Sequence, residues 1–360
     1  MVYHANTYEG ADRTESYVSK STQITYFQRA RCLGALAVVL LHVLSTPMSD
    51  TPVEVLGSSR FFVWYEAQMV LTRWAVPVFF MITGVLLLNP EKRITWDKAF
   101  RYASRMLLVL ATFGLGMNFV KAYSAHGGLT FQTLLDAVQY TFSNTGFRHL
   151  WYLYVLIGFY LLLPLYRAFV SQASRRDLQI LILLVFVLDL GVNTVNTLCG
   201  VHIEFLIIVS SSLFYFFLGY YAHHYLTLDG KVLAAGILGL AIGTGLTAWY
   251  VFTEARYEMW VFSPDYVIIG PWSLVVFLLM KKYLNGPLEP HGIVSRFAEL
   301  SFGIYVLHPL MIQVLYHMCG WGPIALPPLV YVLGVWSVTV VGSAALTWAL
   351  RLIPPVRRIL

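Results

Sequence analysis

Long apolar stretches alternate with short polar segments along nearly the whole chain of 360 residues. A bilayer is crossed by helices of about 20 residues, because a helix satisfies its own backbone hydrogen bonds. The pattern therefore predicts membrane-spanning helices and no sheet. We expect ten of them, at about 26–47, 70–88, 102–120, 150–170, 178–195, 203–226, 232–252, 266–280, 300–318 and 326–353.

The segments outside these stretches are of two kinds. Residues 1–24 are polar and lack the apolar core of a signal peptide, so we expect a mobile cytoplasmic tail before a membrane domain at 25–360. The connection at 122–149 is long, and apolar residues recur along it at helical spacing. This spacing predicts a short amphipathic helix on the outer surface, or else a loop that packs on the bundle. The apolar residues are Phe131, Leu134, Leu135, Val138 and Phe142.

Composition supports a protein of the membrane. Hydrophobic residues make up 58% of the chain and charged residues only 12%, and the mean hydropathy is +0.68. Soluble domains carry about 25% charged residues. A surface with so few charges is tolerated where apolar side chains face lipid, which makes the lipid bilayer the first expected partner.

The net charge is +6, and the distribution of the lysines and arginines between the two sides sets the expected topology. With the N-terminus inside, 19 of the 24 lysines and arginines fall on the inner side of the predicted spans, as in most membrane proteins. We therefore expect a multi-pass protein of the cytoplasmic (inner) membrane, with both termini in the cytoplasm. The basic residues form short clusters between spans and no basic stripe, so nucleic-acid binding is not expected. The five on the outer side are Arg60, Arg73, Lys121, Arg148 and Arg256.

Few ionisable residues lie inside the predicted spans, and such residues usually face protein or a water-filled cavity. His42, Asp189 and His308 lie within spans, and Arg31 opens the first one. Each has a structural alternative. The histidines can bond a backbone carbonyl, Asp189 can bind a neighbouring helix, and Arg31 can extend to the inner headgroups.

No metal site is expected. The three cysteines form no Cys-x-x-Cys pair. His202 with Glu204, and His223 with His224, lack a third ligand at metal-site spacing.

Four stretches, in this order, resemble the membrane acyltransferases of acyltransferase family 3. They are Arg31 and His42 with ten residues between them, VFFMITG in the second span, HLWYLYVLIGFYLLLP in the fourth, and SFGIYVLHPL in the ninth. The similarity extends from about Tyr26 to the last span. It is greatest to the short stand-alone members, such as the enterobacterial common antigen O-acetyltransferase. The chain departs from the family pattern at Gln28, Cys32 and Thr83, and keeps the arginine and the histidine.

The resemblance implies transfer of an acyl group, usually acetyl, from cytoplasmic acyl-CoA to a hydroxyl of a cell-envelope glycan or lipid-linked saccharide. It implies that His42 is catalytic with Arg31, and that Arg31, Arg101 and Arg105 bind the acyl-CoA. Acyl-CoA is then a substrate, and no permanently bound cofactor is expected. His308, Trp151 and Asp189 are candidates for supporting roles.

Helical geometry relates Arg31 to His42. Eleven residues turn an α-helix by about 1100° and advance it by about 16 Å, so both side chains lie on one face. A CoA could bind Arg31 by its phosphates and extend its thioester towards His42. Two cavity-facing residues without a catalytic role would show the same geometry.

A second class of function is also open. The protein could be a transporter or flippase in which His42, Asp189 and His308 bind substrate or relay protons. Transporters usually contain broken helices in matched halves, and the sequence shows no such pairing. Turnover of acetyl-CoA distinguishes the two classes.

Overall fold

The structure is a computed structural model, and it describes residues 10–50, 53–90, 94–203, 210–256, 258–289 and 291–360. Side chains are described over the same ranges except 10–25, 47–50, 53–54 and 259. The secondary structure of this described part is entirely helical. The α-helices are α1 (Gly10–Asp50), α2 (Val53–Leu56), α3 (Ser58–Leu71), α4 (Ala75–Leu88), α5 (Trp96–Val109), α6 (Leu115–His126), α7 (Phe131–Phe142), α8 (Trp151–Gln172), α9 (Arg175–Val185), α10 (Val192–Cys199), α11 (Ser211–Tyr225), α12 (Gly230–Ala248), α13 (Ile269–Tyr283), α14 (Ile293–Gln313), α15 (Pro328–Leu350) and α16 (Pro354–Ile359).

Short π-helical and 3-10 segments continue several of these helices. The π-helical segments are η1 (Leu110–Gly114), η3 (Phe186–Gly191), η4 (Trp249–Thr253) and η6 (Val314–Met318), and the 3-10 segments are η2 (Arg148–Leu150) and η5 (Met259–Phe262). As a result, α5 and α6 form one long membrane helix through η1, and α9 and α10 form another through η3. Such π-segments are common in membrane helices, where neighbouring helices can satisfy the backbone groups that they free.

The expected all-α membrane fold is confirmed. Within the described part, eight helices are long and apolar enough to cross a bilayer, and they coincide with eight of the ten predicted spans. The sixth and eighth predicted spans correspond to α11 and α13, which have 15 residues each. At 1.5 Å per residue, these two rise only about 22 Å, less than the bilayer core. The first seven residues of the sixth span fall largely on positions 204–209, outside the described residues.

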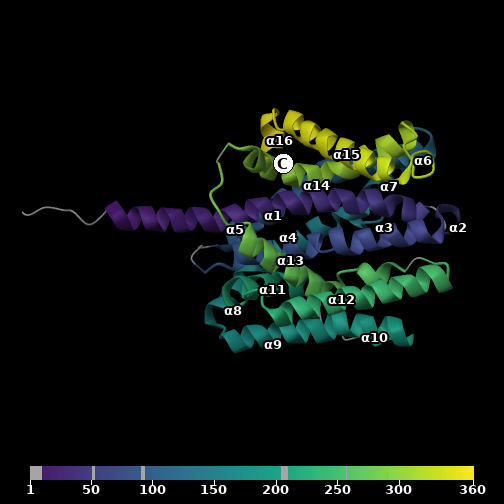
Figure 1. The fold of residues 1–360 in the computed structure, drawn as a ribbon. Coiled ribbons are helices and arrows are strands. Elements are labelled where there is room, and N and C mark those ends of the chain that lie inside the picture. The colour runs from purple at the N-terminus through teal and green to yellow at the C-terminus, as the bar shows by residue number, and fades with distance from the viewer. Residues whose placement is uncertain (1–9, 51–52, 91–93, 204–209, 257, 290) are drawn as a thin grey trace, which may run out of the picture.

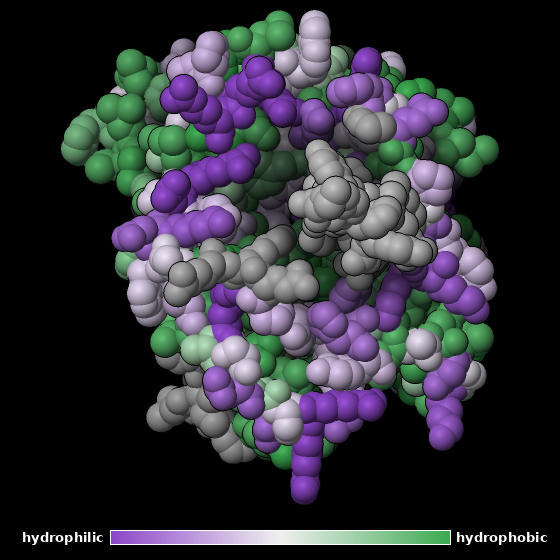
Figure 2. Space-filling model, turned by 90° about the vertical axis from the view of Figure 1, so that its left-hand side faces the viewer, coloured by the Kyte–Doolittle hydropathy of each residue, from purple (hydrophilic) through white to green (hydrophobic). Residues whose placement is uncertain are grey.

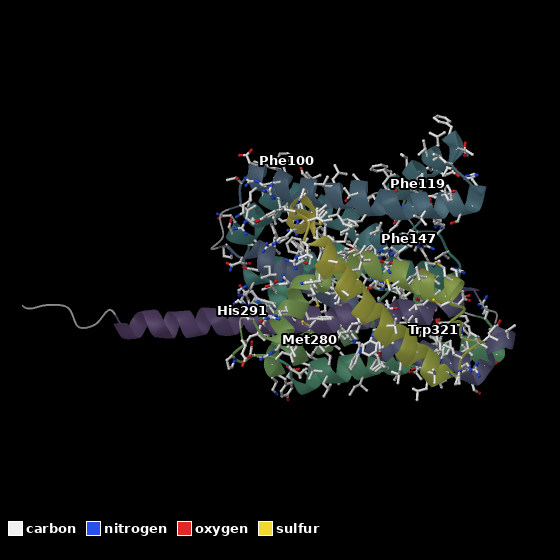
Figure 3. All side chains as sticks on the ribbon, turned by 90° about the horizontal axis from the view of Figure 1, so that it is seen from above. Phe100, Phe119, Phe147, Met280, His291 and Trp321 are labelled. Carbon is white, nitrogen blue, oxygen red and sulfur yellow. The ribbon has the colours of Figure 1, made fainter. Side chains whose placement is uncertain are left out.

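The helices form a bundle with two distinct ends (Figure 1). The first part of α1 extends beyond one of them, and α16 lies at the same end. Of the predicted tail at 1–24, residues 1–9 lie outside the described part of the chain. The residues from Gly10 onward belong to α1. Figure 3 places Phe100 and His291 towards this end, and Phe119 and Trp321 towards the other. Viewed end-on, the face from which α1 protrudes carries many hydrophilic residues, and hydrophobic ones gather at its rim (Figure 2). This end is the one for which the sequence predicts a cytoplasmic location.

Two glycines explain how α4 and α11 pack at the centre of the bundle. A Cβ atom added to Gly84 would lie 1.9 Å from the backbone oxygen of Phe216, and one added to Gly219 would lie 2.2 Å from that of Met81. Any side chain at either position would separate the two backbones. Small residues permit this close approach in membrane proteins. This contact between α4 and α11 fixes the position of α4, which supplies part of the wall of the site described below.

The amphipathic helix expected between 122 and 149 is present as α7. Its small face, with Thr133, Ala137 and Thr141 buried, packs on α6. Asn118 of α6 donates to the Thr141 hydroxyl at 3.1 Å. All five apolar residues of the predicted face are exposed, from 46% for Val138 to 76% for Phe131. The helix therefore packs on the bundle and presents its apolar face outward.

Candidate active site

Three histidines from different helices meet inside the bundle. His42 comes from α1, His149 from η2 at the start of α8, and His308 from α14. Their ring centroids are 4.8 Å apart for His42 and His308, 5.5 Å for His149 and His308, and 6.2 Å for His42 and His149. We call these residues the histidine cluster. His308 is fully buried and His149 is 7% exposed, whereas His42 is only half-buried.

Backbone carbonyls determine which ring nitrogen of His308 carries the proton. The Nδ1 atom of His308 lies 2.8 Å from the oxygen of Tyr305 and 3.1 Å from that of Ile304. A carbonyl only accepts, so this nitrogen donates, and Nε2 of a neutral His308 is left as an acceptor.

The acceptor on His308 orients His42 in turn. Nδ1 of His42 lies 3.2 Å from Nε2 of His308 and 2.9 Å from the oxygen of Val38. Both partners accept, so Nδ1 of His42 carries the proton. The lone pair of His42 is therefore on Nε2, and no other described residue hydrogen-bonds that atom. The carbonyl bond foreseen as the structural alternative for His42 is present, and it leaves the second nitrogen free to act as a base.

A cavity of about 450 Å³ extends along this part of the bundle. Arg31 and His42 both line it, which the same-face geometry of α1 requires. Apolar and aromatic side chains form most of the wall between them. These are Val38, Val76, Phe79, Ile82, Met106, Trp151, Tyr152, Leu156, Tyr160, Ala298, Phe302, Tyr305 and Leu360, with Thr83, His149, Glu299 and Ser301 among them.

Arginines gather at one part of the cavity wall, where Arg31 is joined by Arg105 and Arg351. Arg105 donates from Nε to the oxygen of Ile359 at 3.2 Å, and Arg351 donates from Nη1 to the oxygen of Glu299 at 3.1 Å. Within the described part of the chain, none of the three forms an ion pair, and no hydrogen bond is made by Arg31. With three arginines and one carboxylate, Glu299, in its wall, the cavity therefore combines an excess of positive charge with a histidine base.

The structure brings some of the predicted site residues together and separates others. Trp151 lines the cavity with Arg31, His42 and Arg105, and His308 contacts His42. Arg101 lies one turn before Arg105 on α5 and is exposed outside the cavity wall.

Asp189 lies elsewhere, in η3. Its Oδ1 accepts from Asn193 at 3.4 Å, and Asn193 also donates to the backbone oxygen of Asp265. Asp265 accepts from Ser211 at 2.5 Å and from Ser263 at 2.8 Å. We call this group the aspartate cluster. Asp189 therefore does not line the cavity; it accepts a hydrogen bond from Asn193 of its own helix, and Asn193 links that helix to Asp265.

Sequence reasoning missed several residues of the site. His149 begins the HLWYLYV stretch, at the edge of a predicted span. Nothing at that position indicated that its ring points into the bundle. Arg351 lies near the end of the last predicted span, directly after α15, and the sequence indicated only its place on the inner side. Tyr305 precedes His308 by three residues and donates its hydroxyl to the backbone oxygen of His149. A polar or aromatic residue one helical turn from a buried histidine was the available signal.

Comparisons with known proteins identify the family of the chain. The family model described as "Acyltransferase domain" matches residues 24–348. A relative from Bacillus subtilis (strain 168), described as a putative membrane-bound acyltransferase, YfiQ, is 24% identical over 349 residues. The matched region covers 91% of this chain and 92% of that protein. No solved structure matches. The family model covers nine-tenths of the chain, including every residue of the histidine cluster, and the chain therefore belongs to acyltransferase family 3, as a multi-pass membrane acyltransferase.

Proposed function

We propose that this protein is an O-acetyltransferase of the inner membrane, which moves an acetyl group from cytoplasmic acetyl-CoA to a hydroxyl of a cell-envelope glycan. The observation that carries the proposal is the presence of Arg31 and His42 in one cavity. Among the described residues Arg31 forms no ion pair, and His42 has a free acceptor nitrogen. Arg31 can therefore bind an anionic acyl donor, and His42 can take the proton of an acceptor hydroxyl.

The donor follows from the charge of the cavity. Arginine binds phosphate by paired, charge-assisted hydrogen bonds. Arg31, Arg105 and Arg351 offer this chemistry at the end of the bundle for which the sequence predicts a cytoplasmic location, where CoA is available. Arg31 and His42 are separated by about 16 Å along the helix. An extended pantetheine arm has a comparable length, so the thioester reaches His42 while the phosphates bind the arginines.

The reaction then needs one base, which is His42. Its Nε2 takes the proton of the acceptor hydroxyl as the oxygen attacks the thioester carbonyl. The C–O bond of the ester forms, the C–S bond breaks, and the CoA thiolate takes the proton back from the imidazolium. Atoms and charge balance, and the free imidazole is regenerated. Apolar walls between the arginines and His42 exclude water that would otherwise hydrolyse the thioester.

His308 acts in this scheme as a positioning residue. Its Nε2 accepts from Nδ1 of His42, which keeps the lone pair of His42 on the other nitrogen. When His42 becomes an imidazolium, the same hydrogen bond stabilises the charge. This is the supporting role that the sequence suggested for His308.

The acceptor side of the proposal rests on the resemblance to short stand-alone members, such as the enterobacterial common antigen O-acetyltransferase. A lipid-linked saccharide suits an active site inside the bilayer, because the lipid holds the sugar at the membrane. Arg101, exposed next to Arg105, is placed to meet a part of the donor outside the cavity.

Mass spectrometry of envelope glycans tests the proposal. Cells with the gene should carry O-acetyl esters that cells without it lack, and purified protein should transfer acetyl from labelled acetyl-CoA to the glycan of the deleted strain. A transporter or flippase that uses His42 and His308 without acyl transfer would neither transfer nor hydrolyse acetyl-CoA. That result would reject the enzyme in favour of the transporter.

A further inference from the structure

His149 is the member of the histidine cluster to which no role has yet been assigned. It lines the same cavity as His42, its ring lies 6.2 Å from the ring of His42, and it is 7% exposed. The side chain is held at α14, where Nε2 lies 3.2 Å from the oxygen of Val306. The backbone of the same residue accepts the hydroxyl of Tyr305. Two contacts with one helix therefore fix both the ring and the main chain of His149.

The contact with Val306 determines the proton on this ring as well. A carbonyl accepts, so Nε2 of His149 is the donor and Nδ1 holds the lone pair. In the part of the chain that the structure describes, no group donates a hydrogen bond to this Nδ1. His149 lines the cavity, and an acceptor nitrogen that opens on a cavity receives its hydrogen bond there from a ligand or from water.

The cavity thus contains two acceptor nitrogens, Nε2 of His42 and Nδ1 of His149. A ligand with a single hydroxyl brings one proton and satisfies one of them. Two hydroxyls on neighbouring carbons bring two protons, and the spacing of the rings is within reach of both at ordinary hydrogen-bond distances.

We propose that His149 is a specificity-determining residue which binds the hydroxyl next to the one that is acylated, so that the acceptor is a vicinal diol of a sugar ring. This inference rests on the proposed function and narrows it. His149 holds the second hydroxyl by accepting its hydrogen bond, and takes no proton from it. The attacked hydroxyl is thereby directed to His42. Alcohols without a neighbouring hydroxyl leave the Nδ1 atom unpaired and react poorly.

Two variants separate this role from a structural one. In His149→Gln, the side-chain amide N–H can replace the donor to Val306, and the acceptor at the Nδ1 position is lost. In His149→Asn, the side-chain oxygen lies near the Nδ1 position, and the donor to Val306 is lost. With purified protein, acetyl-CoA and the glycan of the deleted strain, the Gln variant should raise the KM for glycan about tenfold, the worth of one hydrogen bond. The Asn variant should stay within about threefold of the wild type.

Three outcomes overturn the inference. A KM that rises in the Asn variant and not in the Gln variant shows that the bond to Val306 is what matters. Equal loss in both, or no loss in either, removes the acceptor role. Binding of acetyl-CoA by each variant checks that it has folded.

The position of the acetyl group gives a second, independent measurement. NMR of the glycan acetylated by the wild type should place the ester on a carbon whose neighbour carries a free hydroxyl. An ester on a carbon without such a neighbour contradicts the inference and leaves the proposed function intact. Absence of any O-acetyl ester instead rejects the proposed function itself.

Discussion

Two polar clusters differ in how their hydrogen bonds are satisfied: the histidine cluster inside the bundle, and the aspartate cluster, whose Asp265 is exposed. In the aspartate cluster, Ser211, Ser263 and Asn193 donate to the carboxylates, and Asp189 lines no part of the arginine-bearing cavity. In the histidine cluster, backbone carbonyls hold each ring by one nitrogen. His42 and His149 keep an acceptor nitrogen open in that cavity. The first cluster ties helices together, and the second has capacity left for a substrate.

This difference shows why an ionisable residue inside a membrane helix does not by itself indicate catalysis. His42 and Asp189 are both expensive to place in a bilayer. What distinguishes them is the remaining hydrogen-bonding capacity and the cavity next to it. The predictions that follow test this distinction at His42, at the arginines, at His308 and at Asp189.

The largest effect is expected at His42. Replacement by alanine removes the base, and general-base catalysis contributes about 10²- to 10⁴-fold. The His42→Ala variant should therefore transfer acetyl at least 100-fold more slowly, as measured with purified protein and labelled acetyl-CoA. Its amount in membranes should match the wild type, and its thermal stability should fall only slightly, because one buried acceptor, Nε2 of His308, loses its donor.

Replacement of a cavity arginine should weaken the binding of acetyl-CoA and leave the base, His42, unchanged. We expect Arg105→Ala to raise the KM for acetyl-CoA about tenfold, because one charge-assisted contact to phosphate is lost. Arg101→Ala is the matched control, one turn away on the same helix and outside the cavity wall. It should raise this KM less. An equal rise in both variants would mean that the cavity does not define the phosphate site.

His308 should have a smaller effect that depends on the replacement. His308→Ala removes the acceptor for His42 Nδ1, and the rate should fall about tenfold, the worth of one hydrogen bond. His308→Gln can return an acceptor oxygen near the Nε2 position and should recover part of the rate. Full activity of the alanine variant at normal expression would leave His308 with a structural role only.

Asp189 should have the smallest effect. Asp189→Asn keeps an acceptor oxygen for Asn193 and removes a charge outside the cavity. The transfer rate should stay within about twofold of the wild type, since no contact with substrate is lost. A loss comparable to that of His308→Ala would break the comparison between the two clusters and place Asp189 in the reaction.

Hydrophobic patterning predicted most of the fold, because a bilayer requires apolar helices of a set length. It placed all ten helical segments and the amphipathic helix α7, whose exposed face was visible in the spacing of Phe131, Leu134 and Val138. Patterning gave less information about length. The helices α11 and α13 have 15 residues each and are shorter than predicted.

Only the part of the site that lies on a single helix could be predicted from the sequence. Arg31 and His42 share α1, so their common face follows from helical geometry. His149 and Arg351 reach the same cavity from η2 and the end of α15, His308 of α14 contacts His42 behind it, and such convergence depends on tertiary packing. The separation of Arg101 from Arg105, four residues apart on one helix, depends on where α5 meets its neighbours. Sequence spacing alone reveals neither this convergence nor this separation.

The most direct test of the account measures acetyl-CoA binding and acetyl transfer in the same preparations of two variants. His42→Ala should bind acetyl-CoA with an affinity close to that of the wild type and transfer no acetyl group to the envelope glycan. Arg31→Ala should bind acetyl-CoA at least tenfold more weakly, because the arginine without a protein partner is the one that receives the donor. Near wild-type transfer by His42→Ala would contradict the account, whatever the binding data show.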